Sequence, residues 1–153
     1  MTSLRSQPLF TIQMRLHPFQ DLGATPFGQR RVVPVSGGDF EGTRLRGTVL
    51  PHAGADWLLQ RGDGSFQQDV RLTLQADDGA LIGMTYRGVR HATPEVSARL
   101  ARGEPVDPSE YYLRTAPFFE TGAPRYAWLN HIVAVGVGRR LPDGVVYDVF
   151  EVL

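Results

Sequence analysis

The chain is built from short segments in which apolar and polar residues alternate, and this period of two constrains its fold most. Residues 9–16 place Phe10, Ile12 and Met14 on one face and Thr11 on the other. This alternation is typical of a β-strand with one buried face. The further segments predicted as strands are 31–35, 44–50, 56–61, 68–75, 80–88, 111–116, 127–138 and 145–153. Short strands at such regular spacing favour a sandwich or a barrel.

Turn residues separate these segments, in keeping with the 17 glycines and 11 prolines of the chain. Asp77-Asp78-Gly79 and Pro142-Asp143-Gly144 predict hairpin turns, and residues 61–64 predict a looser one. The pair Gly37-Gly38 predicts a sharp reversal, because glycine tolerates positive φ. Residues 17–27 are predicted as a turn-rich connection.

One short helix is predicted after residue 93. Thr93 can cap it, Pro94 suits its first position, Glu95 can pair with Arg99, and Gly103 can end it. With nine or so strands and one helix, residues 1–153 are predicted to form a single all-β domain. We expect an antiparallel up-and-down β-barrel of lipocalin-like or outer-membrane-protein-like topology, but soluble, since closure removes exposed strand edges.

Composition excludes several functions. The 16 basic residues, all arginine, balance 16 acidic residues, so neither nucleic acid nor a membrane surface is an expected partner. The absence of lysine and cysteine excludes Schiff-base and thiol chemistry. The four histidines lack a zinc spacing, and Gly136-Val137-Gly138 leads into a hairpin turn, so neither a metal nor a cofactor is expected.

No signal-like N-terminus and no apolar run of about 18 residues is present, so we expect a cytoplasmic protein. A small-molecule ligand is the expected partner, and a homo-oligomer is compatible with these patterns.

Two arginines raise the question of which strand face points inward. Arg71 alternates with Val70 and Leu72, and Arg114 alternates with Leu113. The plain reading is that the arginine faces meet solvent. We instead predict that they face the barrel interior, where Arg71 and Arg114 clamp a carboxylate or enolate.

Other polar and aromatic residues complete the predicted site. Asp56, beside Trp57, is either a base with a raised pKa or a satisfied buried carboxylate. Asn130 is the only asparagine and is predicted to orient the ligand from a strand that it shares with Trp128. Trp57 and Trp128 are predicted pocket walls, and the remaining predicted ligand-binding residues are Tyr86, Tyr112 and Glu120.

The order of several motifs resembles the DUF3237 family, also called UPF0311. The resemblance covers about residues 8–153, and Leu113 stands where that family has phenylalanine. It implies a closed or nearly closed antiparallel barrel and the polar and aromatic set Glu41, Arg46, Asp56, Trp57, Arg71, Arg114, Glu120, Trp128 and Asn130. The motifs are Gly37–Gly42, Leu45–Pro51, Gly54–Trp57, Asp69–Arg71, Asp78–Ile82, Tyr112–Pro117, Phe119–Thr121 and Tyr126–Asn130.

Three functions are consistent with these residues. The first is an enzyme of lyase, isomerase or cyclase type that works without a cofactor on an anionic or aromatic metabolite inside the barrel. The second is a barrel that binds a small ligand without turnover. The third is a structural domain whose interior is filled by an arginine–carboxylate network.

Overall fold

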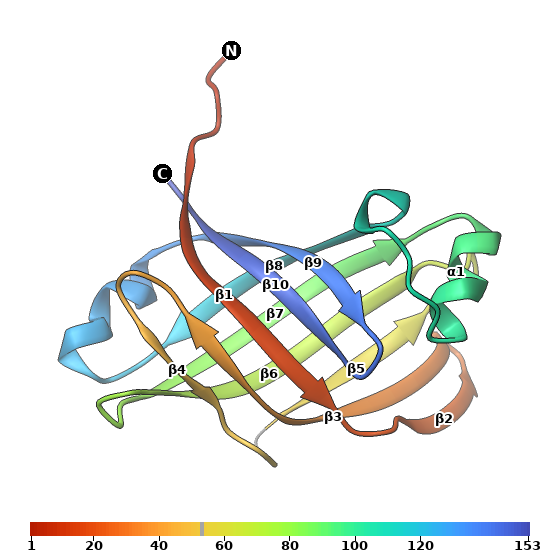
Figure 1. Cartoon of the computed structure of the whole chain (residues 1–153), viewed down its shortest axis with the longest axis horizontal. Helices are drawn as coiled ribbons and strands as arrows, with labels where there is room; N and C mark the ends of the chain where they lie inside the picture. Colours follow the sequence, from red (N-terminus) through yellow and green to blue (C-terminus); the bar gives the residue numbers. More distant parts are fainter. Residues whose placement is uncertain (53) are drawn as a thin grey trace.

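Ten antiparallel strands form one closed sheet in the computed structural model, which describes residues 1–52 and 54–153 (Figure 1). The strands are β1 (Ser6–Leu16), β2 (Gln20–Thr25), β3 (Gly28–Glu41), β4 (Arg46–Val49), β5 (Ala55–Gln60), β6 (Phe66–Ala76), β7 (Leu81–His91), β8 (Tyr112–Glu120), β9 (Ala134–Leu141) and β10 (Gly144–Val152). The helical elements are α1 (Pro94–Ala101), η1 (Pro108–Glu110) and η2 (Pro124–His131).

The barrel closes because β1 pairs with both β10 and β3. β4 and β5 follow one another in the gap between β3 and β6. β2 pairs with the start of β3. The result is an eight-stranded barrel with two extra strands, so the predicted all-β, up-and-down barrel is confirmed.

Two local predictions near the start of the chain are wrong. Gly37-Gly38 does not reverse the chain, because β3 runs through both residues; Gly37 has φ +141° beside a shift in the β1–β3 register. A Cβ on Gly38 would collide with the backbone of Gln13, so this glycine allows close strand contact. Residues 17–27 contain the short strand β2. The many turn-forming residues of this segment favoured a connection over a strand in the sequence-based prediction.

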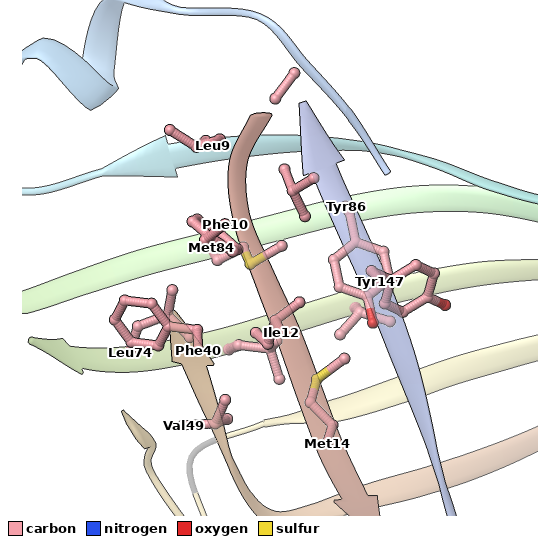
Figure 2. Close-up of a cluster of buried hydrophobic side chains, with 14 of the residues drawn as sticks. Leu9, Phe10, Ile12, Met14, Phe40, Val49, Leu74, Met84, Tyr86 and Tyr147 are labelled. Atoms are coloured by element: carbon pink, nitrogen blue, oxygen red, sulfur yellow. The ribbon is translucent and has the colours of Figure 1, made fainter. Parts of the chain in front are cut away.

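The interior takes the aliphatic face of the central strands (Figure 2). Val70, Leu72 and Leu74 of β6 are buried, whereas Arg71 is exposed. The prediction that the arginine-bearing face of this strand points inward is therefore wrong. Burying the leucines removes apolar area from water, and the guanidinium keeps its hydration outside.

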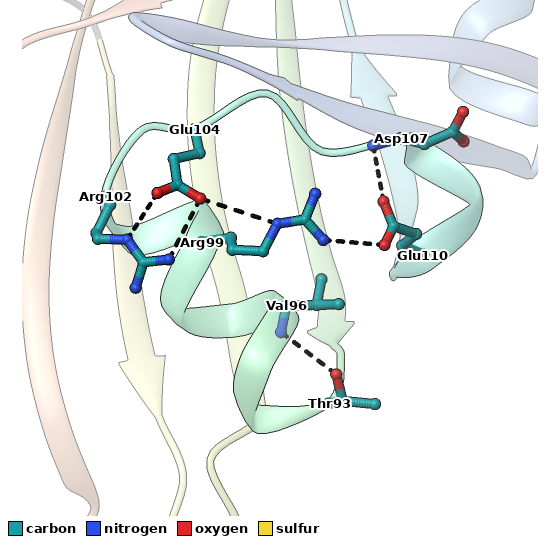
Figure 3. A network of polar contacts seen from close by, with 7 residues as sticks. All are labelled: Thr93, Val96, Arg99, Arg102, Glu104, Asp107 and Glu110. Carbon is teal, nitrogen blue, oxygen red and sulfur yellow. Dashed lines mark hydrogen bonds and ion pairs between the residues drawn. The ribbon is translucent and has the colours of Figure 1, made fainter.

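The predicted helix is present as α1. Thr93 caps it by accepting the backbone N–H of Val96, and Gly103 follows it with φ +73°. Arg99 pairs with Glu104 and Glu110 in place of the predicted Glu95, which ties the helix to the following loop (Figure 3).

The predicted strand 127–138 is wrong in its first half. Residues up to His131 belong to the 3-10 element η2, and β9 begins at Ala134. The Asn130 side chain explains the difference, because it bonds the backbone of Thr121 and Ala127 and so competes with strand pairing. Across the described residues, no helix combines the length and apolar character needed to cross a membrane.

Candidate functional site

One end of the barrel, beside α1, holds a partly open cavity of about 520 Å³. Its walls come from the inner faces of the strands, and Ser97, Leu100 and Ala101 of α1 line it as well. This volume is within the range of about 300–1,000 Å³ found for small-molecule sites. The aliphatic core fills the rest of the barrel interior. Polar side chains enter the interior at this cavity.

Strand register brings Asp56 and Tyr86 into one row. Val70 of β6 pairs with Asp56 of β5 on one side and with Tyr86 of β7 on the other. The Tyr86 ring meets the Tyr147 ring of β10 edge to face, with centroids 5.4 Å apart (Figure 2). Asp56, Tyr86 and Tyr147 all line the cavity.

The Asp56 side chain is held by the backbone of the neighbouring strand. Its Oδ1 accepts the N–H of Asp69 at 3.0 Å, in a gap where β5–β6 pairing is interrupted between Asp56 and Leu59. The Trp57 carbonyl, which lies in the same gap, accepts instead from Arg30 at 2.7 Å. Asp56 therefore has one oxygen fixed by the sheet, and among the described residues no hydrogen bond is made by Oδ2 of this cavity-lining group.

Burial raises the pKa of Asp56 from 3.8 to about 7, because the charged carboxylate loses hydration inside the barrel. The bond from Asp69 and the charges of Arg90 and Arg140 oppose this rise, and the Asp69 charge adds to it. A carboxyl group with this pKa can both accept and return a proton near neutral pH.

Arg31, Arg90 and Arg140 also line the cavity. Arg90 is only 9% exposed, and its guanidinium stacks on Phe66 at 4.3 Å from the ring centre. Burial and the like charge of Arg140 lower the pKa of Arg90 to about 10. Arg140 is positioned through its backbone N–H, which donates to the Tyr111 hydroxyl at 2.8 Å.

The buried part of the site carries excess positive charge. Among the described residues, no carboxylate lies within 4.0 Å of the Arg31, Arg90 or Arg140 guanidinium groups. The Nε atoms of Arg31 and Arg140 are buried without a partner, as is Oε1 of Gln68. Unpaired buried polar atoms are costly, so the two Nε donors suit an anionic guest, whereas Oε1 of Gln68 suits a hydrogen-bond donor.

Five other predicted site residues lie away from the cavity lining, on outer or end surfaces. Trp57 is 51% exposed and Tyr112 is 44% exposed. Arg114 lies over the Tyr112 ring and donates to the Leu113 carbonyl, so Arg71 and Arg114 do not form a clamp inside the barrel. Glu120 is exposed at the end of β8.

Asn130 and Trp128 belong to η2, at the end of the barrel opposite α1 (Figure 1). Asn130 is exposed and holds the η2 backbone. Trp128 packs against the Arg44 guanidinium, 3.4 Å from the ring centre. Both residues therefore stabilise the far end of the barrel, and Asp56 and Tyr86 are the predicted site residues that line the cavity.

Three cavity-lining residues, Arg90, Arg140 and Tyr147, are not among the site residues predicted from the sequence. Arg90 continues the inward alternation of Met84 and Tyr86, but the predicted strand stopped at residue 88. Arg140 lies between the predicted strand 127–138 and the predicted turn at residues 142–144, whereas β9 extends to Leu141. Tyr147 shares its phase with Val145 and Val149, and this signal was available within the predicted strand 145–153.

No group of three histidine, aspartate or glutamate side chains is placed to hold a metal ion within residues 1–52 and 54–153. The cavity donors are chiefly guanidinium and phenol groups, which recognise anions and carbonyl oxygens rather than cations.

These features define a closed antiparallel β-barrel with an arginine-lined cavity at one end. The chain belongs to the DUF3237 family, because the model of that family, described as a protein of unknown function, matches residues 4–152. A UPF0311 protein of Rhodopseudomonas palustris is 38% identical over 151 residues, which cover 99% of this chain and 98% of the relative.

Solved structures agree with the fold. A crystal structure of a conserved Rhodopseudomonas palustris protein of unknown function has a TM-score of 0.96 at 38% identity and covers both chains fully. A beta-barrel like protein from Acinetobacter baumannii has a TM-score of 0.86 at 39% identity, with 100% of this chain and 98% of that chain covered. A structure described as an enzyme from Penicillium herquei, at 21% identity, has a TM-score of 0.75 and covers 100% and 97%, so it shares the fold.

Proposed function

We propose that this barrel is a cofactor-independent enzyme of the lyase, isomerase or cyclase type that acts on an anionic small molecule with an aromatic or flat apolar body. The observation that carries the proposal is Asp56, a cavity-lining carboxyl group anchored through Oδ1 and influenced by the charges of the buried Arg90 and the half-buried Arg140. Proton transfer is the chemistry that such a group performs without a further reagent.

Arg90 and Arg140 are the binding part of this proposal. Their guanidinium groups lie close enough for the charge of each to affect Asp56, and Arg140 lowers the pKa of Arg90. An anionic group of the substrate would relieve their mutual repulsion and gain charge-assisted hydrogen bonds. The apolar body of the substrate would then contact Phe66, Leu58 and Leu113 in the same cavity.

Asp56 is the proton carrier. Its Oδ2 takes a proton from the bound substrate, and the resulting carboxylic acid returns a proton to a different atom of the same molecule. The electron count of the substrate is unchanged, which is why isomerisation, ring closure and elimination are the reaction types that fit. Because its pKa is near 7, both halves of this cycle are accessible at neutral pH.

Hydrogen–deuterium exchange tests this role without knowledge of the natural substrate. Phenylpyruvate and benzoylacetate, which combine a carboxylate, a ring and an acidic C–H, are incubated with the protein in D₂O and followed by ¹H NMR. We expect exchange at least ten times faster with the native protein than with Asp56→Asn. Asp39→Asn, which alters an exposed carboxylate of β3, is the matched control and should exchange at the native rate.

A non-catalytic ligand-binding barrel is the competing function. It would give saturable binding of these acids, measured by fluorescence, with the same exchange rate for the native protein and for Asp56→Asn. That outcome would overturn the enzyme proposal and favour binding alone. If neither acid binds nor exchanges, then the assignment of the cavity to aromatic anions is wrong.

A further inference from the structure

Tyr86 and Tyr147 line the same cavity as Asp56, and the proposed function leaves them without a role. We propose that these two tyrosines form an oxyanion-binding pair, and that the substrate is therefore a carbonyl compound with an acidic C–H next to its carbonyl group. This inference rests on the proposed proton transfer by Asp56 and names its substrate class.

The two tyrosines come from strands that are not neighbours in the sheet. Tyr86 is on β7 and Tyr147 is on β10, with β8 and β9 between them. Their rings still meet at 5.4 Å between centroids and 63° between planes, so the side chains reach each other across the interior (Figure 2). Tyr86 is 5% exposed and Tyr147 is 3% exposed, yet both line the cavity.

The strand next to Tyr147 is shaped around its ring. A Cβ added to Gly138 of β9 would lie 2.5 Å from Cε1 of Tyr147, and one added to Gly136 would lie 3.6 Å from Cδ1. The Tyr147 ring therefore lies against two glycines of β9. A side chain at Gly138 would occupy space that the ring now fills. This gives the Gly136-Val137-Gly138 segment a role, which is to make room for the tyrosine rather than to bind a nucleotide.

Both hydroxyl groups stay protonated under ordinary conditions. Burial raises the pKa of Tyr86 well above its usual value, with smaller contributions from Tyr147 and Asp56. Burial also raises the pKa of Tyr147, and the charge of Asp56 adds to this effect. A neutral, buried phenol O–H is a strong donor to a developing enolate oxygen, because a fixed donor needs little reorganisation when charge appears.

The step balances within one substrate molecule. Asp56 takes the proton from the carbon next to the carbonyl group, and the C–H electron pair forms a carbon–carbon double bond. The carbonyl π pair moves onto oxygen, where the tyrosine hydroxyls donate to it. The oxygen electron pair then re-forms the carbonyl group. In an isomerisation the proton on Asp56 passes to the γ-carbon of a conjugated enolate, and in an elimination it passes to the group expelled from the β-carbon, so Asp56 ends as the carboxylate in both cases.

The probe for this site is 6-hydroxy-2-naphthoate, whose carboxylate suits the arginines and whose phenolate mimics the enolate. Its ionisation is followed by ultraviolet absorption while it is bound to Asp56→Asn, which removes the competing carboxylate charge. We expect the bound phenol to ionise at least one pH unit below the free phenol. Tyr86→Phe and Tyr147→Phe, each in this background, should reverse most of that shift, and Tyr112→Phe, at an exposed outer position, should leave it unchanged.

The same tyrosine variants are made in the protein with Asp56 intact and assayed for deuterium exchange of phenylpyruvate. We expect exchange to slow at least tenfold, with binding of 2-naphthoate within threefold of native as the check that the cavity is intact. If Tyr86→Phe and Tyr147→Phe match Tyr112→Phe in both ionisation and exchange, the oxyanion role is overturned while Asp56-dependent exchange still supports the proposed function. A tyrosine-dependent ionisation shift without any exchange would instead support the oxyanion pair and contradict the enzyme.

Discussion

The Asp56 carboxylate accepts the backbone N–H of Asp69, the residue that precedes its own sheet partner Val70. The bond replaces a piece of the β5–β6 ladder, so the side chain is positioned by the barrel wall itself. A carboxyl group fixed in this way keeps one oxygen for the cavity without help from a second side chain. We therefore expect the free energy of unfolding of the barrel to depend on whether Asp56 is protonated.

We predict that Asp56 makes stability fall as pH rises. Its pKa is about 7 in the folded protein and 3.8 in an exposed carboxyl group, so between these values the folded state holds a proton that the unfolded state releases. The free energy of unfolding of the native protein, relative to Asp56→Asn, should fall by about 2–4 kcal/mol between pH 4 and pH 8, with no further change above pH 8. Urea denaturation across this range measures it.

Asp39→Asn is the control for this difference, because Asp39 is exposed and its partner Arg15 is 3.8 Å away. Its stability relative to the native protein should vary little with pH. A native protein whose stability relative to Asp56→Asn rises with pH would show that Asp56 is stabilised as the carboxylate, contrary to the burial argument.

Arg90→Met should weaken the binding of 2-naphthoate by roughly 2–5 kcal/mol, because it removes one charged partner from a desolvated site. The free energy of unfolding of the ligand-free protein should be unchanged or higher. The variant no longer buries a charged guanidinium group, and it removes the repulsion between Arg90 and Arg140. Arg71→Met, on the outer face of β6, is the matched control and should bind normally. Isothermal titration calorimetry distinguishes the two, and equal losses for both variants would place the anion outside the cavity.

Gly138→Ala should destabilise the barrel by ~1–3 kcal/mol through overpacking. The new methyl group would stand 2.5 Å from Cγ of Leu113 and from Cε1 of Tyr147, so one of these side chains must move. Gly62→Ala, in the β5–β6 turn, meets nothing within 4 Å and serves as the control. Thermal unfolding of the two variants gives the comparison; a Gly138→Ala barrel as stable as Gly62→Ala would show that the ring has space on that side.

Thr93→Ala should cost about 1 kcal/mol by removing the cap of α1, which accepts from Val96 N–H at 3.3 Å. In a domain of this size the melting temperature would fall by roughly 2–4 °C. Thr93→Ser keeps the hydroxyl and should melt near the native temperature. If serine and alanine destabilise equally, the methyl group of Thr93 rather than its cap stabilises the helix.

The barrel could be predicted because its determinants are local. Alternation in residues 9–16 and 68–75 and the turn residues at 77–79 and 142–144 define strands and hairpins without reference to distant contacts. The helix after Thr93 is encoded in the same way, by a cap, a proline and a terminal glycine. Antiparallel neighbours then follow from short connections.

The site could be predicted only in part, because alternation defines two faces but not which one is inside. On β6 the aliphatic face is buried, and polar residues enter the interior only toward one end, as Gln68 does. Arg90 lies beyond the end of the predicted strand 80–88, and Arg140 lies beside the predicted turn at residues 142–144. A sequence pattern is weakest at such positions. Their meeting depends on the register in which β7 and β9 pair with β8, the strand between them.

The most direct test of the account is the titration of Asp56 itself. The ¹³C carboxyl resonance of this residue, assigned by comparison with Asp56→Asn, is followed from pH 3 to pH 9 in the ligand-free protein. We expect a midpoint at about pH 7, because burial beside the cavity disfavours the charged carboxylate. A midpoint near pH 4, as in an exposed aspartate, would contradict it and remove Asp56 from the role of proton carrier.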